Sequence, residues 1–332
     1  MVSNATPVKQ ATASVAKRAA TIVVVGCVAY FFWKAFSHNW QSVQAHRFEL
    51  AYPYLVVAFA AAVATIILYD YAWFVTVNAL SGRSAITFTQ TLATVNTSGL
   101  TKYVPGKLWS FALQMYWLAK LGLSKSLILY VNAINMLVSM LAAVMLGLGF
   151  LLFSSDRYPW STTLAWLAGL LLVDACCITF HGPILNWGIL LLNRLLKRNV
   201  ARIDVSTRLI LRLHAIHLAA SVASAVGGYA LCFGIGYRIG VVQAMLVMSS
   251  LLLSEVVGYL AFLVPGGLGV REGIMYVMLG GAATGSLSLI LPLATRAVNM
   301  IVEVALGLIS LRLLKSLAGQ EEAEPAPQSP SP

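Results

Sequence analysis

Charged side chains are scarce in this chain. Asp, Glu, Lys and Arg make up 10% of its 332 residues, whereas apolar types make up 59%. A soluble globular domain carries about 25% charged residues, so the composition excludes an ordinary soluble domain. Long apolar stretches at 54–80, 126–153 and 288–311 exceed the ~20 residues that cross a bilayer as a helix. The sequence therefore predicts an all-α, polytopic integral membrane helix bundle.

Motifs for metals, cofactors and catalysis are also missing. The chain has four cysteines but no C-x-x-C pair and no Cys/His cluster, which argues against a disulfide framework and a zinc site. GGLGVREG lacks the spacing of a dinucleotide-binding loop, and no serine lies in a G-x-S-x-G turn. We expect no catalytic centre, no metal and no cofactor, and we place His214 and His217 at the membrane interface.

Positive charge is the exception to this scarcity, because 22 Lys and Arg stand against 11 Asp and Glu. A net charge of +11 could indicate a nucleic-acid partner, but six of the cations lie between 194 and 212. Such a cluster is typical of a cytoplasmic loop beside anionic lipid. We expect no nucleic-acid partner, and cytoplasmic N- and C-termini in a bacterial inner (plasma) membrane. The six cations are Arg194, Lys197, Arg198, Arg202, Arg208 and Arg212.

Two Pro-Gly breaks, KYVPGKLW at 102–109 and VPGGLG at 264–269, interrupt the apolar sequence. Each follows two expected helices and precedes one, which indicates an internal duplication. An odd number of spans in each half inverts the second half, and paired breaks of this kind point to the central site of a transporter. We expect the first broken segment, 84–121, to be a re-entrant hairpin from the cytoplasmic face. The second, 241–285, enters from outside or crosses as two short spans.

The predicted organisation is a cytoplasmic lead-in at 1–18, one transmembrane domain at 19–315 and a disordered tail at 316–332. Within the domain, repeat one covers about 19–153 and repeat two about 161–315. Spans without a Pro-Gly break are expected at about 19–37, 52–80, 126–153, 161–192, 210–236 and 287–315, and the 161–192 span is either straight or bent at His181-Gly182-Pro183.

A non-helical stretch at membrane depth needs a protein-lined or water-filled cavity, because unsatisfied backbone groups are costly in hydrocarbon. The helix that restarts after each break offers free N–H groups and a positive dipole end to an anion. Lys102, Lys107 and Arg271 add full positive charge there. The sequence thus predicts an electropositive chamber that binds phosphate. The alternatives are lysines that reach the interface, and an Arg271 paired with Glu272 or Glu255.

The last predicted helix carries a polar face. Arg296, Asn299 and Glu303 follow an i, i+3, i+7 spacing and so share one side of it. Arg296 could bind an anionic head group, while Glu303 could carry a proton or hold a second cation. A salt bridge between helices is the alternative. Asp70 and Asp174 are expected to be structural hydrogen-bonding groups.

Together, NTSGLTKYVPGKLW and LVPGGLGVREG resemble the paired signatures of the lysylphosphatidylglycerol synthase transmembrane-region family. This flippase-like membrane module also occurs in the multiple peptide resistance factor, and the likeness runs from about residue 20 to 315. The resemblance implies a bundle that moves a lipid between leaflets, without the soluble aminoacyl-transferase domain of the resistance factor. The expected substrate-binding residues are Lys102, Pro105, Gly106, Lys107, Pro265, Gly266, Gly267, Gly269, Arg271 and Glu272 by motif match, with Glu255, Arg296, Asn299 and Glu303 added from the membrane-embedded polar residues.

The favoured function is a lipid flippase, or a transporter of an anionic phospholipid or a lipid-linked polyprenyl or glycolipid intermediate, with membrane lipids as its partners. One alternative is an integral-membrane lipid or glycan transferase that uses Glu255, Glu272 or Glu303 as an acid or base. Another is a non-catalytic membrane subunit that docks a glycosyltransferase or other lipid-modifying enzyme through the basic loop at 194–212.

Overall fold

The computed structural model describes residues 49–82, 84–103, 108–154, 159–183, 204–261, 269–280 and 285–323, together with 33, 37, 44, 187 and 267. The elements formed within these ranges are all helical, which confirms the all-α class. In chain order they are α3 (Tyr52–Ser81), α4 (Phe88–Gly99), the 3-10 helix η1 (Leu100–Tyr103), α5 (Leu108–Lys120), α6 (Lys125–Leu152), α7 (Trp160–Thr179), α9 (Thr207–Gly234), α10 (Val241–Leu260), α11 (Val270–Leu279) and α12 (Gly285–Ala323).

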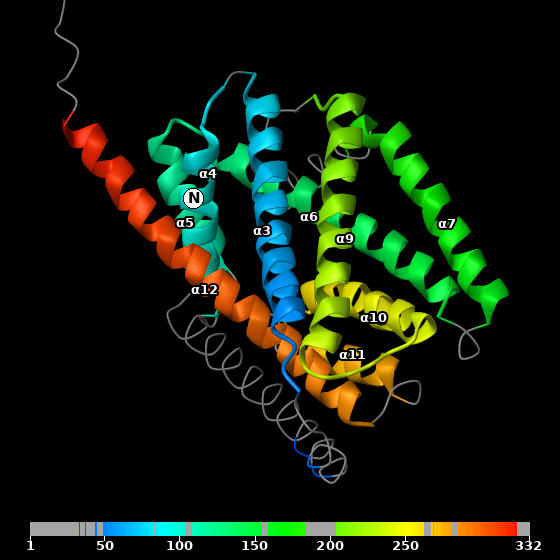
Figure 1. The fold of residues 1–332 in the computed structure, drawn as a ribbon. Coiled ribbons are helices and arrows are strands. Elements are labelled where there is room, and N and C mark those ends of the chain that lie inside the picture. The colour runs from blue at the N-terminus through cyan, green and yellow to red at the C-terminus, as the bar shows by residue number, and fades with distance from the viewer. Residues whose placement is uncertain are drawn as a thin grey trace, which may run out of the picture.

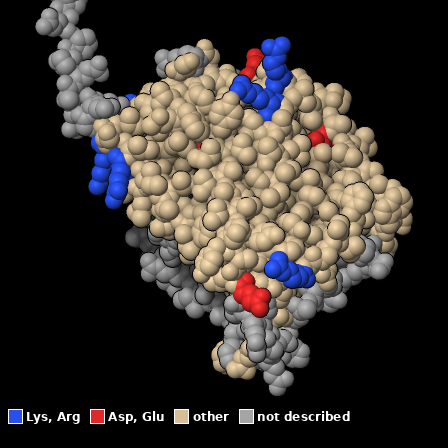
Figure 2. Space-filling view, in the orientation of Figure 1, with Lys and Arg blue, Asp and Glu red and all other residues tan. Residues whose placement is uncertain are grey.

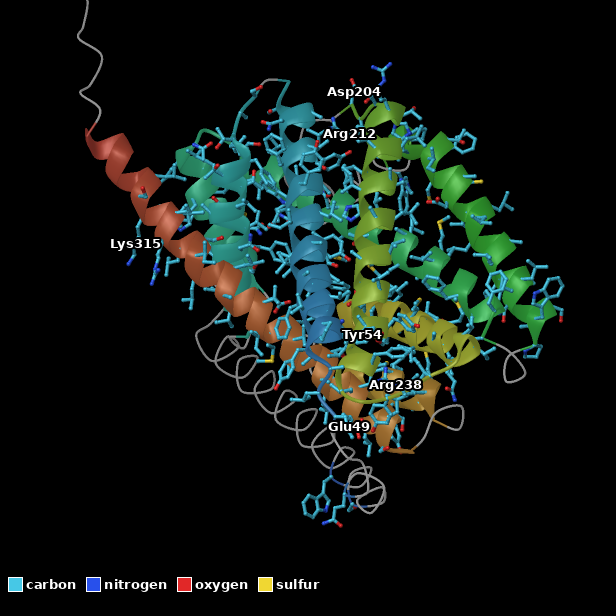
Figure 3. All side chains as sticks on the ribbon, in the orientation of Figure 1. Glu49, Tyr54, Asp204, Arg212, Arg238 and Lys315 are labelled. Atoms are coloured by element: carbon cyan, nitrogen blue, oxygen red, sulfur yellow. The ribbon has the colours of Figure 1, made fainter. Side chains whose placement is uncertain are left out.

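Six of these helices are long and apolar enough to cross a bilayer: α3, α6, α7, α9, α10 and the Ser286–Leu317 part of α12. Figure 2 shows a broad area of other residues across the face in view, with charged side chains at its top, near its lower end and at its left edge. Asp204 and Arg212 lie at one end and Glu49 and Arg238 at the other (Figure 3). The chain is therefore a polytopic integral membrane protein.

Helices α3 and α9 lie side by side in the middle of the bundle (Figure 1). They run antiparallel, because the N–H of Ala51 donates to the carbonyl oxygen of Gly234 at 3.1 Å, so the start of α3 meets the end of α9. A glycine permits their close approach, since a Cβ on Gly227 would lie 3.1 Å from that of Ala61. Around this pair, α12 packs on α4 and α6 packs on α10, while α7 lies at an edge against α6 and α9.

This packing is what a duplicated chain would show. In the predicted repeats α3 corresponds to α9, α4 to α10 and α6 to α12. The contact of α4 with α12 then has its counterpart in the contact of α10 with α6, and both contacts are extensive. The antiparallel central pair also agrees with an inverted second half. The inverted repeat itself stays a prediction.

Several helix ends follow from local sequence. Thr87 and Gln90 form a capping box at the start of α4: Thr87 Oγ1 accepts from the N–H of Gln90 at 3.2 Å, and Gln90 Oε1 accepts from the N–H of Thr87 at 2.8 Å. Ser124 and Ser206 cap α6 and α9 in the simpler way, each accepting a backbone N–H at 3.2 Å. Helix α3 stops at Gly82, whose φ of 68° lies in the left-handed region.

The first break is preceded by a short helix. The 12 residues of α4 span only about 18 Å, which is less than the hydrocarbon core of about 30 Å. The chain then tightens into η1 and resumes as α5. Pro105, Gly106 and Lys107 lie outside the described residues, as do the side chain of Lys102 and most of the predicted span at 19–37.

The second break separates two helices of unequal length. The 20 residues of α10 reach about 30 Å, so this helix alone is long enough to cross the hydrocarbon core. Helix α11 has 10 residues and is too short to cross. Helix α7 ends at Thr179, and residues 181–183 are again helical, which agrees with a bend near His181 in the predicted 161–192 span. One boundary needs correction: α12 continues to Ala323, because Ala, Gln and Glu in its last turns are good helix formers.

Candidate functional site: a charged cavity at the centre of the bundle

A cavity of about 230 Å³ lies where α3, α4, α9, α10, α11 and α12 meet. Small residues make room for it, among them Ala58 and Ala62 on α3 and Gly227 and Gly228 on α9. Among the described residues, four charged side chains line it: Asp70, Glu255, Arg271 and Glu303. Ionisable groups are costly within a membrane and usually face a bundle interior or a water-filled pathway, so this hollow is the candidate site.

Arg271 and Glu255 form an ion pair across the cavity wall, joining the first turn of α11 to α10. Their side chains are 20% and 12% exposed, so the pair is largely shielded from solvent. The sequence left open that Arg271 forms an ion pair with Glu272 or Glu255, and the structure identifies the partner as Glu255. A glycine behind the pair lets the helices approach, since a Cβ on Gly258 would lie 3.2 Å from that of Arg271.

Gly267 lies against Gly258 of α10 in a glycine-to-glycine contact. Gly267 has a φ of 66°, and a Cβ there would lie 2.8 Å from the carbonyl oxygen of Gly258. A side chain at this position is therefore excluded both by backbone conformation and by contact. Gly269, with a φ of 80°, precedes α11 and donates its N–H to Glu272 Oε2 at 2.6 Å. The two glycines thus position the helix that carries Arg271.

Glu272 and Arg296 form a second charged pair beside the cavity. Arg296 Nε lies 3.8 Å from Glu272 Oε1, so the pair joins α12 to α11. Neither residue is among those that line the cavity. Glu272 Oε2 accepts the N–H of Gly269 in the cap of α11, and Glu272 Oε1 faces Arg296. We infer that both residues hold α11 in place.

The sequence predicts an electropositive chamber, but the described lining has the opposite balance. Its charged side chains are the carboxyl groups of Asp70, Glu255 and Glu303 and the single guanidinium of Arg271. The side chains of Lys102 and Lys107 lie outside the described residues. Within the part of the site that the structure describes, three acidic groups therefore share one permanent cation.

The structure brings together four of the predicted site residues, Glu255, Arg271, Asn299 and Glu303, as lining residues of one cavity. Gly267 and Gly269 belong to its supporting loop, whereas Pro265 and Gly266 lie outside the described residues. The predicted shared face of α12 is confirmed for Asn299 and Glu303, which both line the cavity, while Arg296 pairs with Glu272.

Other lining residues escaped the sequence prediction, notably Tyr69, Asn96 and Tyr259. Asp70 was expected to be a structural hydrogen-bonding group, and it does accept a bond from Asn96 Nδ2 at 2.6 Å. It also lines the cavity, a role that its position inside an apolar span could have indicated. Asn96 lies in a Thr- and Ser-rich stretch that the sequence marks as too polar to face lipid, yet nothing local pairs it with Asp70.

His214 and His217 were predicted to lie at the membrane interface, and their depth stays a prediction. Both side chains are buried within the bundle, at 8% and 2% exposure, on a helix that packs against α3, α6 and α7. His214 Nε2 lies 2.9 Å from Asp174 Oδ1, and His217 Nε2 lies 3.1 Å from Asn135 Oδ1. The structural role expected for Asp174 is confirmed by its bond to His214.

Comparison with known proteins gives one family match and no match among curated proteins. The family is described as the lysylphosphatidylglycerol synthase transmembrane region, and its model matches residues 18–307, which include both Pro-Gly breaks and every helix that lines the cavity. This family points to a membrane function related to lipids. With the match covering most of its length, the chain belongs to the lysylphosphatidylglycerol synthase transmembrane-region family.

Proposed function

We propose that this protein moves the polar head group of a lipid between the two leaflets of the bacterial inner membrane, by way of the central cavity. The substrate is an anionic phospholipid or a lipid-linked polyprenyl or glycolipid intermediate. The observation that carries the proposal is the cavity itself, with charged side chains from α3, α10, α11 and α12 inside an apolar bundle. A bundle that needed only stability would gain little from that many ionisable groups.

The size of the cavity supports a head group as the occupant. Pockets for drug-sized ligands measure about 300–1,000 Å³, and a volume of about 230 Å³ falls just below that range. A head group with some water fits such a space, whereas acyl or prenyl chains do not. The chains would remain in the bilayer while the polar part crosses.

The Arg271–Glu255 pair supplies a way to hold and release a phosphate. A phosphate that enters the cavity competes with Glu255 for the guanidinium of Arg271, which binds phosphate oxygens in the same forked geometry as a carboxylate. Asn299 offers a neutral donor, and Glu303 and Asp70 can accept from hydroxyl or amino groups of the head group. The exchange replaces one ion pair of Arg271 by another and leaves Glu255 without its counter-charge, so a proton or an amino group of the head group must neutralise Glu255 while the lipid is bound.

Reconstituted vesicles test the proposal. Fluorescent phosphatidylglycerol, phosphatidylethanolamine and a polyprenyl phosphate are each placed in both leaflets, and a membrane-impermeant reductant reports the label that reaches the outer leaflet. We expect the wild-type protein to expose inner-leaflet label of at least one of these lipids. Glu303→Gln, which neutralises a cavity carboxyl group, should slow that movement, whereas Glu49→Gln at the exposed end of the bundle should not.

Movement of every lipid at the rate of protein-free vesicles would overturn the proposal. Equal rates of lipid movement for Glu303→Gln and Glu49→Gln would show that the cavity is not the route of the head group. We also propose that transport proceeds without chemical change of the lipid. Analysis of lipid extracted from the same vesicles checks this point, since a new lipid product would favour the transferase alternative.

A further inference from the structure

A strip of polar side chains leads from the cavity along α9 into the interior of the bundle. His214, His217, Ser221 and Ser224 follow one another at intervals of three or four residues, so they share one face of the helix. Ser224 lines the cavity, whereas Ser221 and His217 are 1% and 2% exposed. The hydroxyl of Ser221 and Nδ1 of His217 both lack a hydrogen-bond partner among the described residues.

The neighbours of His217 fix which ring nitrogen carries its proton. Asn135 Nδ2 donates to Thr76 Oγ1 at 3.0 Å and to the carbonyl oxygen of Val131 at 2.9 Å, so Asn135 Oδ1 is an acceptor. This oxygen lies 3.1 Å from His217 Nε2, which must therefore be the N–H of the neutral ring. Nδ1 is left with a buried lone pair and no donor among the described residues, which is an unfavourable state for a neutral side chain.

His214 holds its protons in a different way. Its Nδ1 lies 2.9 Å from the carbonyl oxygen of Ile210, and its Nε2 lies 2.9 Å from Asp174 Oδ1. Both nitrogens face oxygen acceptors, so a proton occupies each gap, either as an imidazolium–carboxylate pair or as a neutral ring facing a carboxylic acid. Both ring nitrogens of His214 thus have hydrogen-bond partners, whereas Nδ1 of His217, three residues along the helix, has a lone pair that can accept a proton.

Tyr69 on α3 separates His217 from the cavity. The two rings have centroids 5.5 Å apart, and Tyr69 itself lines the cavity within electrostatic reach of Glu255 and Arg271. The groups that contact His217 or its partner come from three helices: α3 brings Tyr69, α6 the neutral Asn135, and α7 Asp174 through His214. On the cavity side of Tyr69, the charged lining residues are Asp70 on α3, Glu255 on α10, Arg271 on α11 and Glu303 on α12.

We propose that His217 is a proton-binding site of the transport domain, reached from the cavity along the polar face of α9, and that its protonation is coupled to lipid movement. The proton comes from water that enters the cavity, binds the lone pair of Nδ1 and returns to water by the same or the opposite side. The added positive charge competes with Arg271 for the carboxyl groups of the described lining, which weakens the hold of Glu255 on Arg271 and frees the guanidinium for phosphate. The coupling half of this proposal rests on the proposed function, whereas the proton-binding half does not.

The proton site is tested by NMR of ring-¹⁵N-histidine in nanodiscs. The chain contains five histidines, so single substitutions assign the signals. From pH 8 down to the pH at which near-UV circular dichroism reports unfolding, we expect one neutral Nε2–H ring to become doubly protonated while the fold is intact. This signal should vanish in His217→Gln and persist in His181→Gln, whose ring lies instead between the carbonyl oxygens of Ile178 and Val205.

If His217→Gln fails to fold, the triple variant His38→Gln/His46→Gln/His181→Gln keeps the titration readable. Of the two histidines that it retains, His214 carries a proton on Nδ1, which donates to the carbonyl oxygen of Ile210, so the neutral Nε2–H signal belongs to His217. A ring that stays neutral until the protein unfolds would overturn the proton site.

Coupling is tested in the lipid vesicles with a pH difference across the membrane. We expect the gradient to change the rate of lipid movement in wild-type protein and in His181→Gln but not in His217→Gln. The same gradient response in His217→Gln as in wild type would overturn coupling through this residue. Absence of any lipid movement would instead refute the proposed function and the coupling with it, while the NMR titration would still decide the proton site.

Discussion

The Arg271–Glu255 pair offers the sharpest test of the site. Its side chains are only 20% and 12% exposed, and two further carboxyl groups, those of Asp70 and Glu303, line the same cavity. Arg271→Met keeps much of the side-chain volume and removes the charge, leaving Glu255 among like charges. Removing one partner of a buried pair typically costs about 3–5 kcal/mol of unfolding free energy, and we expect Arg271→Met to fall in that range.

Glu255→Gln should cost less than Arg271→Met. The guanidinium of Arg271 stays within electrostatic reach of Glu272 and Glu303, so it does not lose all its counter-charge. We expect a loss of about 1–3 kcal/mol, typical of a buried hydrogen-bonding group that loses a charged partner. In the double variant both charges are absent, and its cost should fall below the sum of the single costs by about 2–3 kcal/mol.

The measurement is reversible unfolding in mixed detergent and SDS micelles, followed by the fluorescence of the eight tryptophans. Arg312→Met is the matched control, because this arginine is exposed near the end of α12 and its replacement should stay within about 0.5 kcal/mol of wild type. Equal costs for Arg271→Met and Arg312→Met would mean that the pair is solvated and contributes little. Strict additivity in the double variant would equally refute the reasoning.

Two further predictions use the same unfolding assay. Gly267 and Gly82 have nearly the same φ, 66° and 68°, but only at Gly267 would a Cβ meet a neighbour, the carbonyl oxygen of Gly258 at 2.8 Å. Alanine should therefore cost about 1–2 kcal/mol at Gly82 and clearly more at Gly267, and equal losses would contradict the contact. Asn96→Leu removes the donor to Asp70 and should cost about 1–3 kcal/mol. Adding Asp70→Leu should recover part of that loss of unfolding free energy. No recovery would show that Asn96 does not stabilise the protein through its hydrogen bond to Asp70.

Much of the fold follows from the sequence alone. Spans predicted at 52–80, 126–153 and 210–236 coincide closely with α3, α6 and α9, because bilayer thickness demands long apolar helices that composition reveals directly. The break at VPGGLG is equally local, since Pro265 cannot continue a helix and Gly267 requires a positive φ. Helical periodicity likewise places Asn299 and Glu303 on one face, and that face does line the cavity.

The tertiary structure alone decided which of these polar groups meet. The sequence left Arg271 with two candidate partners, and the packing of α11 on α10 selects Glu255, while Glu272 turns to Arg296 and to the cap of its own helix. Likewise, nothing in the sequence indicates that His217 lies against Tyr69. Hydrophobicity and periodicity are properties of one segment and can be read along the chain, whereas a buried ion pair or a cavity depends on how segments distant in sequence pack, which no single segment encodes.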